Sequence, residues 1–184
     1  MSSPKVRHLL NNLCTLPETS YLEIGSWKGS TWVSALYNNK DTLSQAISID
    51  NWSHFGGEDN FKANCTRFLP GVPYKTYSAD CFALDIHEVC PIPVNIYFYD
   101  GEHTALAQEM AFTYYDEILD DVFIAIVDDW NWDMVQNGTR AAFEKLDYQI
   151  LYERILPAKW NEEKQNFDME NWWNGLYIAV IKRR

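Results

Sequence analysis

The chain has 184 residues, of which 47% are hydrophobic and 22% charged, a composition typical of one ordinary globular domain. We therefore expect a single domain that spans residues 1–184. The 26 acidic residues outnumber the 15 lysines and arginines, so the formal net charge is −11. A surface of that sign repels phosphate backbones, which argues against a nucleic-acid partner. No stretch approaches the ~20 apolar residues that cross a bilayer, and the first residues lack a signal-peptide pattern. We expect a cytoplasmic protein without a membrane partner.

Short apolar segments rich in β-forming residues alternate with helical or turn-rich segments along the chain. This order is typical of βαβ units, whose strands form a mostly parallel sheet with right-handed crossovers. The predicted strands cover residues 21–24, 46–50, 74–78, 94–100 and 122–128. Several of them end in an acidic residue, and ligands of open α/β sheets bind at the carboxyl ends of the strands.

Helical patterns separate these strands, and the last part of the chain returns to β-rich sequence. The predicted helices cover residues 31–37, 60–68, 104–119 and 137–146, with a further helix at the N-terminus. Two β-rich segments, 148–154 and 175–182, follow at the end and are separated by a polar segment that carries tryptophans. We interpret this polar segment as a loop, and a loop of such length in a compact domain is usually functional.

Two glycines follow the first predicted strand, in the sequence EIGSWKGST of residues 23–31. Gly25 and Gly29 allow the backbone to turn sharply and approach a ligand, and the helix that follows presents free N–H groups to a carboxylate. The pattern predicts a cofactor-binding loop. An ordinary strand-to-helix turn is the alternative, because short glycine patterns are weak signals.

Acidic residues close the second and third predicted strands. Asp50, at the end of the second, can accept hydrogen bonds from both ribose hydroxyls of an adenosine-containing ligand. Asp80, at the end of the third, can meet the adenine amino group of the same ligand. The alternative for both is a solvated surface carboxylate.

The pattern Glu23-x-Gly25-x-x-x-Gly29-Ser30-Thr31 resembles motif I of the class I S-adenosylmethionine-dependent methyltransferases. NAD-binding domains instead carry G-x-G-x-x-G, which this chain lacks. The resemblance implies that both glycines admit the methionine part of the cofactor, that Ser30 and Thr31 meet its carboxylate and that Glu23 lies near its amino group. It also implies a Rossmann-like, doubly wound, mostly parallel seven-stranded sheet with an antiparallel C-terminal strand.

The sequence Asp50-Asn51-Trp52 extends this resemblance, since it is similar to the Asp-x-Trp of one methyltransferase subgroup. Trp52 is therefore added to the residues expected to bind S-adenosylmethionine.

Three aspartates follow two neighbouring predicted strands. Asp100 ends the fourth strand, and Asp128 and Asp129 end the fifth, so the fold brings the three together. Converging carboxylates repel one another unless a cation or shared protons compensate, and Mg²⁺ prefers oxygen ligands of this kind. The alternative is a set of solvated loop acids that cap the following helices.

The Asp-Gly-x-His of residues 100–103, with the later Asp-Asp, is similar to metal-dependent sugar O-methyltransferases of macrolide and aminocoumarin biosynthesis. The wider family is described as methyltransferase domain 24. The resemblance implies that Asp100, Asp128 and Asp129 hold Mg²⁺ and that His103 is the general base, which makes Asp100 and His103 the expected catalytic residues. A hydroxyl needs such help, because it is a poor nucleophile until a metal lowers its pKa or a base removes its proton. His54, on a glycine-containing loop, is the rival base.

The acceptor is expected to be a small molecule or a glycan, and the segment 157–173 is the candidate for one wall of its site. Trp160, Trp172 and Trp173 offer flat apolar faces suited to sugar rings, or they pack on the sheet edge or in a homo-oligomer contact. The sequence thus predicts Mg²⁺-dependent O-methylation of a hydroxyl on a sugar or similar small molecule. The alternatives are a metal-independent N-methyltransferase and a non-catalytic, cofactor-binding partner subunit.

Overall fold

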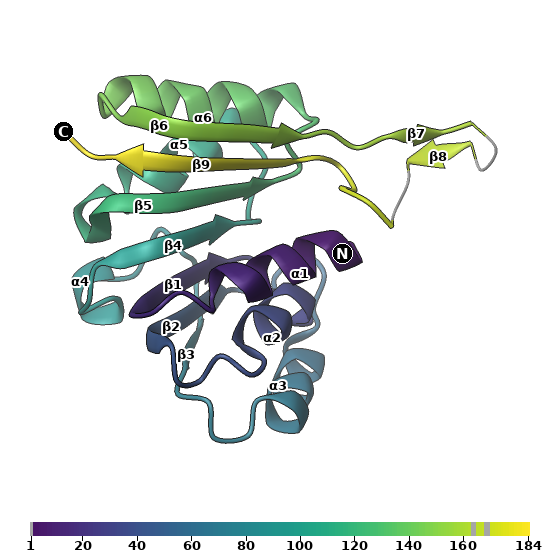
Figure 1. Cartoon of the computed structure of the whole chain (residues 1–184), viewed down its shortest axis with the longest axis vertical. Coiled ribbons are helices and arrows are strands. Elements are labelled where there is room, and N and C mark those ends of the chain that lie inside the picture. The colour runs from purple at the N-terminus through teal and green to yellow at the C-terminus, as the bar shows by residue number, and fades with distance from the viewer. Residues whose placement is uncertain (1, 163–164, 168–169) are drawn as a thin grey trace.

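A seven-stranded sheet runs through the protein, and the computed structural model describes residues 2–162, 165–167 and 170–184. The strand order is β3-β2-β1-β4-β5-β9-β6 (Figure 1). The strands are β1 Thr19–Ile24, β2 Leu43–Asp50, β3 Lys75–Ser78, β4 Val94–Tyr99, β5 Leu119–Asp128, β6 Gln149–Leu156 and β9 Leu176–Lys182. β9 runs antiparallel to β5 and β6, and the other neighbouring strands are parallel. The predicted doubly wound, mostly parallel seven-stranded sheet with an antiparallel C-terminal strand is confirmed.

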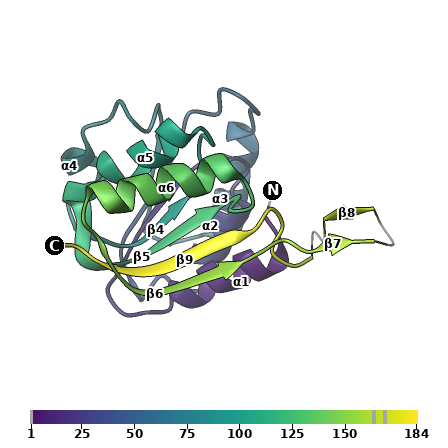
Figure 2. The same ribbon diagram turned by 90° about the horizontal axis from the view of Figure 1, so that it is seen from above.

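Helices cover both faces of the sheet. They are α1 Pro4–Leu13, α2 Ser30–Leu36, α3 Glu58–Phe68, α4 Ile86–Val89, α5 Ala105–Thr113 and α6 Asp133–Lys145. Apolar residues of α1, α2 and α3 pack on one face, and those of α4, α5 and α6 form a separate cluster on the other. Figure 2 shows α1 and α6 on opposite sides of the sheet. In the central strands β1 and β4, alternate side chains therefore point into one core or the other.

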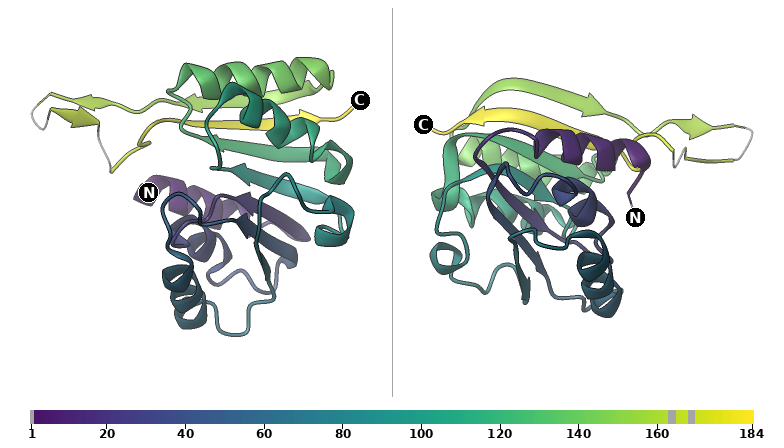
Figure 3. Two further views of the ribbon diagram at one scale, coloured as in Figure 1. Left: turned by 180° about the vertical axis from the view of Figure 1, so that it is seen from behind. Right: turned by 60° about the horizontal axis from the view of Figure 1, so that its bottom comes forward.

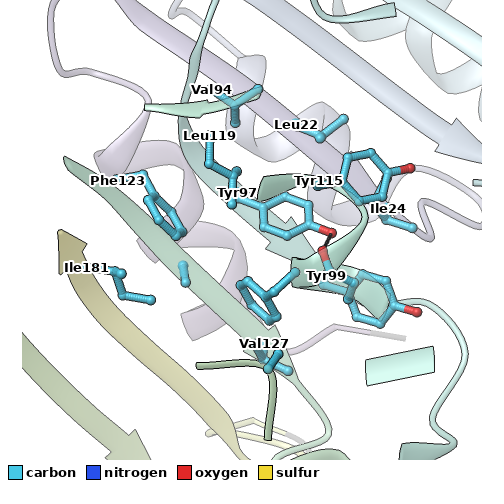
Figure 4. Packing of buried hydrophobic residues seen from close by; sticks show 14 of the residues in the cluster. Leu22, Ile24, Val94, Tyr97, Tyr99, Tyr115, Leu119, Phe123, Val127 and Ile181 are labelled. Carbon is cyan, nitrogen blue, oxygen red and sulfur yellow. Dashed lines mark hydrogen bonds between the residues drawn. The ribbon is translucent and has the colours of Figure 1, made fainter. Parts of the chain in front are cut away.

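The central strands are buried on both faces, as expected for parallel strands between two helical layers. In β4, Tyr97 and Tyr99 point into the same core as Leu119, Phe123 and Val127 of β5 (Figure 4). The Tyr97 hydroxyl donates to the carbonyl of Ala111 at 2.8 Å, so its one polar group is satisfied within the core.

The strand order reverses between β1 and β4, which lie side by side although the chain leaves β1 toward β2. Crossovers on either side of this point run on opposite faces, so the carboxyl ends of β1 and β4 face the place where a doubly wound sheet binds its ligands. The glycine loop follows β1, and Asp100 follows β4. The fold therefore brings the two main sequence motifs to one edge.

The predicted helix 104–119 was too long. α5 ends at Thr113, a single 3₁₀ turn spans Asp116–Ile118, and Leu119 already belongs to β5. The apolar spacing continues past Thr113 because Tyr115 and Ile118 are also buried in the core. The predicted helix 137–146 was too short, since α6 begins at Asp133 without a side-chain cap at Trp132 that would have marked its start.

Part of the segment predicted to be a loop between residues 157 and 173 forms a short hairpin of β7 Trp160–Asn161 and β8 Asn166–Phe167. Figure 3 shows this hairpin extending beyond the end of the sheet. Residues 163–164 and 168–169 of the segment lie outside the described part of the chain. Among the helices of the described residues, none combines the length and the apolar composition needed to cross a membrane.

The contact between α5 and α6 depends on Gly138, where a Cβ would lie 2.2 Å from the carbonyl oxygen of Ala105. Alanine in a helix is normally favoured over glycine by about 1 kcal/mol. We expect the opposite here, with Gly138→Ala lowering the free energy of unfolding by about 1–3 kcal/mol through overpacking. Urea denaturation checks this, with Asn137→Ala on the exposed side of α6 as the control. A Gly138→Ala variant as stable as the control would contradict the close helix contact.

Candidate active site

The glycine loop lies directly against the backbone that follows β4. Gly25 has a φ of 86°, and a Cβ at this position would lie 2.0 Å from the carbonyl oxygen of Asp100. The Gly25 N–H donates to the backbone carbonyl of Ile49 at 3.0 Å, and the Asp100 N–H donates to the backbone carbonyl of Ile24 at 2.9 Å. Only glycine fits this place, because both the backbone angle and the neighbouring carbonyl exclude a side chain. The loop predicted to hold a cofactor is thus in contact with the loop that carries the carboxylates.

Asp50 joins the glycine loop to the loop after β2. Its two carboxylate oxygens accept from the backbone N–H groups of Trp27 and Trp52, each at 2.7 Å. The Trp52 indole donates in turn to the Trp27 carbonyl at 2.6 Å. A carboxylate can accept about four hydrogen bonds, so Asp50 keeps acceptor positions for a ligand. Its place at the loop agrees with the predicted ribose contact, which stays a prediction.

Trp27 and Trp52 both have the left-handed backbone that side chains rarely adopt, with φ of 45° and 48°. Such conformations cost energy and gather at functional sites. The indole Nε1 of Trp27 is buried and has no hydrogen-bond partner among the residues that the structure describes. The sequence analysis did not single out Trp27, although its place between the two glycines was a usable signal.

Glu23 is fully buried behind the glycine loop. Its carboxylate accepts from the Tyr21 hydroxyl at 2.5 Å and from the Thr31 hydroxyl at 2.7 Å. Burial raises the pKa of Glu23 to about 7, although hydrogen bonds from Tyr21, Thr31 and Ser26 act in the opposite direction. The structure therefore places Glu23 and Thr31 against each other, a contact that the separate cofactor roles predicted for them did not include.

The remaining predicted cofactor residues occupy different surroundings. Gly29 has a φ of 82° and lies over Phe61 of α3. Ser30, the first residue of α2, shares a hydrogen bond of 2.8 Å with the Ser2 hydroxyl. Asp80 is exposed after β3 and accepts from the Phe82 N–H at 2.9 Å, a local turn contact. The structure links Asp50 to the glycine loop and shows no such link for Asp80 within the described residues.

Among the residues that the structure describes, Asp100, His103 and Asp129 form a group whose geometry could hold a metal ion. One donor atom from each lies within 4.8 Å of the other two. The Nε2 atom of His103 is buried and lies 2.7 Å from Oδ2 of Asp129, although the pair does not form an aligned hydrogen bond and Nε2 has no other partner in the described chain. The prediction had combined the three aspartates as ligands, with His103 apart from them as the base.

Asp128 stands beside this group rather than within it. Its side chain is 7% exposed, and its Oδ1 atom finds no hydrogen-bond donor among the described residues. Burial, followed by the charge of Asp129, raises the pKa of Asp128 to about 7. Burial and the charges of Asp128 and Asp129 likewise raise the pKa of Asp100 well above its usual range. The close contact with the Asp129 carboxylate favours the charged form of the imidazole and raises the pKa of His103.

Trp132 completes the surroundings of His103, and the sequence analysis did not name it. The two rings lie 4.9 Å apart at 58°, and the Trp132 side chain remains 43% exposed. Trp130, two residues earlier, is instead buried and stacks on Tyr177 at 4.1 Å. The rival base, His54, is exposed after β2 and faces Phe55 at 6.3 Å. Of the two histidines, His103 is the one in contact with the carboxylates.

The predicted wall tryptophans differ in their exposure and surroundings. Trp160 is 52% exposed in the hairpin strand β7. Trp172 is partly buried against the core beside α1, with the Lys5 ammonium 5.8 Å from its ring. Trp173 is half-buried in the same segment. Their predicted contact with an acceptor stays a prediction.

Comparison with known sequences leaves the family open. No model of a known protein family matches the chain. An uncharacterized protein of Acanthamoeba polyphaga mimivirus is 32% identical over an alignment of 103 residues that covers 52% of this chain and 46% of that protein. The chain thus matches about half the length of this curated relative.

Comparison with solved structures is more informative about the fold. An O-methyltransferase from Bacillus cereus in complex with S-adenosylhomocysteine superposes with a TM-score of 0.68, covering 99% of this chain and 83% of that one at 16% identity. The chain has the fold of the S-adenosylmethionine-dependent methyltransferases. A precorrin-6y methyltransferase from Geobacter metallireducens gives a TM-score of 0.67 at 13% identity, covering 100% and 90% of the two chains.

A further structure with this methyltransferase fold is the magnesium protoporphyrin IX methyltransferase from Synechocystis with bound S-adenosylmethionine. It gives a TM-score of 0.64 at 10% identity and covers 98% of this chain and 77% of that one. Because the names of these neighbours differ in the compound that is methylated, the fold does not identify the acceptor.

The buried Glu23 generates a testable dependence of stability on pH. Its pKa is about 7 in the folded chain against 4.5 for an ordinary glutamate, so folding favours the protonated form. The contribution of the protonated Glu23 to the free energy of unfolding is fully present below pH 4.5 and is lost as the pH rises through about 7. This contribution is on the order of 3 kcal/mol.

Glu23→Gln removes this titration while keeping an acceptor and a donor for the two hydroxyls. We expect the variant to gain stability relative to the wild type as the pH rises from 5 to 8, measured by urea denaturation at several pH values. Parallel curves for the two proteins would show that Glu23 titrates normally in the folded chain.

Proposed function

We propose that this protein is an S-adenosylmethionine-dependent methyltransferase that transfers the methyl group to a hydroxyl of a sugar or similar small molecule, with a divalent cation at the carboxylate group. The observation that carries the proposal is the backbone contact between Gly25 and Asp100, where a Cβ would lie 2.0 Å from the carbonyl oxygen. This contact supports the proposal because it joins the glycine loop, which would bind the methyl donor, to the carboxylates, which would hold the acceptor hydroxyl. Methyl transfer requires that these two sites adjoin.

The residues at the glycine loop fit S-adenosylmethionine. Gly25 leaves the end of β1 free of a side chain, and Asp50 keeps acceptor positions for ribose hydroxyls while it holds the backbone of Trp27 and Trp52. The buried Nε1 of Trp27 is a donor without a partner in the described chain, as expected where a ligand supplies the acceptor. When bound, the cofactor supplies the methyl group on its sulfonium.

The residues after β4 and β5 fit a divalent cation. Asp100, Asp129 and His103 offer donor atoms within 4.8 Å of one another, and the buried Asp128 adds an unpartnered oxygen beside them. Within the described residues, no lysine or arginine forms an ion pair with these aspartates. A bound cation lowers the pKa of a coordinated hydroxyl. The carboxylates would hold that cation and orient the acceptor oxygen toward the methyl group.

The acceptor would approach from the side of Trp132. This ring is 43% exposed and its backbone is fixed at the start of α6, where the Trp132 N–H donates to the Asp129 carbonyl at 3.0 Å. A fixed and partly exposed aromatic face binds the flat apolar side of a ring at small entropic cost. The neighbouring acids make an uncharged acceptor more suitable than an anionic one.

Cofactor binding is tested by titrating the purified chain with S-adenosylhomocysteine in a calorimeter. Asp50→Ala should weaken binding by about 1–3 kcal/mol, because ribose hydroxyls lose a charged acceptor and two backbone N–H groups lose theirs. Asp41→Ala, at the opposite end of β2, is the matched control and should bind as the wild type does. A wild-type chain that binds NAD but not S-adenosylhomocysteine would contradict the proposal.

Transfer is tested with radiolabelled S-adenosylmethionine against panels of glycans, small hydroxyl compounds and amines, with and without EDTA. We expect methylation of hydroxyl compounds that stops in EDTA and returns when a divalent cation is added. Activity on amines that persists in EDTA would favour a metal-independent N-methyltransferase. Cofactor binding without transfer to any panel would favour a non-catalytic partner subunit.

A further inference from the structure

We propose that His103 is a ligand of the cation and not the general base, and that the site therefore selects a first-row transition metal such as Mn²⁺ or Co²⁺ over Mg²⁺. The inference rests on the proposed function for the role of the cation in methyl transfer. Its evidence is the arrangement of Asp100, His103, Asp128 and Asp129 at the ends of β4 and β5.

The register of β4 and β5 sets this arrangement. Tyr99 pairs with Val127, so the loop that carries Asp100 and His103 begins level with the end of β5. Asp129 then takes a left-handed backbone with a φ of 56° directly after the strand. Non-glycine residues of this kind mark places where the surrounding structure enforces a side-chain direction. One donor atom each from Asp100, His103 and Asp129 consequently comes within 4.8 Å of the others.

The contact between His103 and Asp129 differs from that of a base and its orienting carboxylate. A carboxylate that orients a catalytic imidazole accepts a hydrogen bond from one ring nitrogen and leaves the other facing the substrate. Here Nε2 lies 2.7 Å from Asp129 Oδ2 but is buried without an aligned hydrogen bond to any described residue. Two atoms that coordinate the same metal ion lie at a similar distance from each other, so the 2.7 Å between Nε2 and Oδ2 suits a pair of metal ligands.

Asp128 supplies an independent sign that a cation belongs here. Asp128 is only 7% exposed, and its Oδ1 atom has no hydrogen-bond donor in the described part of the chain. A buried carboxylate oxygen without a partner is costly unless a positive charge lies nearby. Asp128 directly precedes Asp129, one of the three residues whose donor atoms lie within 4.8 Å of one another.

The donor set indicates the class of metal. Mg²⁺ is bound through oxygen atoms and keeps several waters, whereas an imidazole nitrogen suits first-row transition metals. One imidazole among carboxylates therefore shifts the preference toward Mn²⁺ and Co²⁺. The Trp132 ring packs beside this imidazole, with the two ring centroids 4.9 Å apart.

The test uses the whole chain, freed of metal by dialysis against a chelator and titrated with manganese, cobalt or magnesium chloride in a calorimeter. We expect Mn²⁺ and Co²⁺ to bind at least ~10-fold more tightly than Mg²⁺. His103→Ala should lower Mn²⁺ affinity by at least ~10-fold, since loss of a ligand costs no less than loss of an outer-shell partner. His87→Ala, with an exposed histidine beside Glu117, is the control and should bind Mn²⁺ unchanged.

Electron spin-echo spectroscopy of the Mn²⁺-loaded chain detects a nitrogen atom bound directly to Mn²⁺. It therefore distinguishes a metal ligand from a residue that only supports the fold. We expect nitrogen modulation from a directly bound imidazole in the wild type and the His87→Ala control, and its absence in His103→Ala. Circular dichroism of each variant confirms that it is folded. Mn²⁺ affinity and nitrogen modulation that survive in His103→Ala would overturn the inference, as would a wild type that binds none of the three ions.

S-adenosylhomocysteine binding, measured on the same samples, separates this inference from the proposed function. A chain that binds Mn²⁺ through His103 but does not bind S-adenosylhomocysteine would contradict the methyltransferase function and leave the ligand role standing. A chain that binds S-adenosylhomocysteine, and holds Mn²⁺ equally well without His103, would contradict the ligand role alone.

Discussion

The close approach of Gly25 to the Asp100 carbonyl is the constraint on which the site depends. It exists because β1 and β4 lie side by side where the strand order reverses, and because the residue after β1 has no side chain. The hydrogen bond from the Asp100 N–H to Ile24, at 2.9 Å, holds the two strand ends level. One side of this contact continues into the glycine loop and Asp50, and the other into the loop of His103. A side chain at position 25 would therefore disturb both the glycine loop with Asp50 and the loop that carries His103.

Electrostatics sets the second constraint. Asp100, Asp128 and Asp129 converge at two neighbouring strand ends, and burial raises the pKa of both Asp100 and Asp128. Converging carboxylates of this kind oppose folding unless protons or a cation neutralise them. Glu23 differs from this group, since Tyr21 and Thr31 satisfy both its oxygens inside the helical layer. Among the buried acids near the glycine loop, Glu23 is thus satisfied by two hydroxyls, whereas Asp128 keeps an oxygen without a hydrogen-bond partner in the described chain.

The sequence could predict the mostly parallel sheet and the edge where the candidate site lies, because both follow from local patterns, whereas the seven strands and the antiparallel last strand followed from the family resemblance. Apolar strands between helical segments indicate a doubly wound sheet, and acids at strand ends indicate the edge where ligands bind. The position of Asp50 at the glycine loop follows from the same reasoning. The 3₁₀ turn at Asp116–Ile118 could not be distinguished from a continued helix, because its buried residues keep helical spacing.

The finer geometry of the site depends on contacts that no local pattern carries. Whether His103 meets Asp129 is decided by the register of β4 on β5 and by the left-handed backbone of Asp129. Trp132 reaches His103 only because α6 starts at Asp133, earlier than its sequence indicates. The hydroxyl of Thr31 turns toward Glu23 because α2 packs on the face of β1 where Glu23 lies.

The central claim, that one backbone contact couples the glycine loop proposed to bind the cofactor to the loop proposed to hold a cation, is tested most directly by Gly25→Ala. Gly71→Ala is the matched control, because Gly71 also has a positive φ of 74° but has no atom within 4 Å of an added Cβ. The affinities for S-adenosylhomocysteine and for Mn²⁺ are measured by calorimetry on folded samples of both variants. The account predicts that Gly25→Ala loses both affinities together while Gly71→Ala keeps both. A folded Gly25→Ala protein that binds either ligand as tightly as the wild type would contradict it.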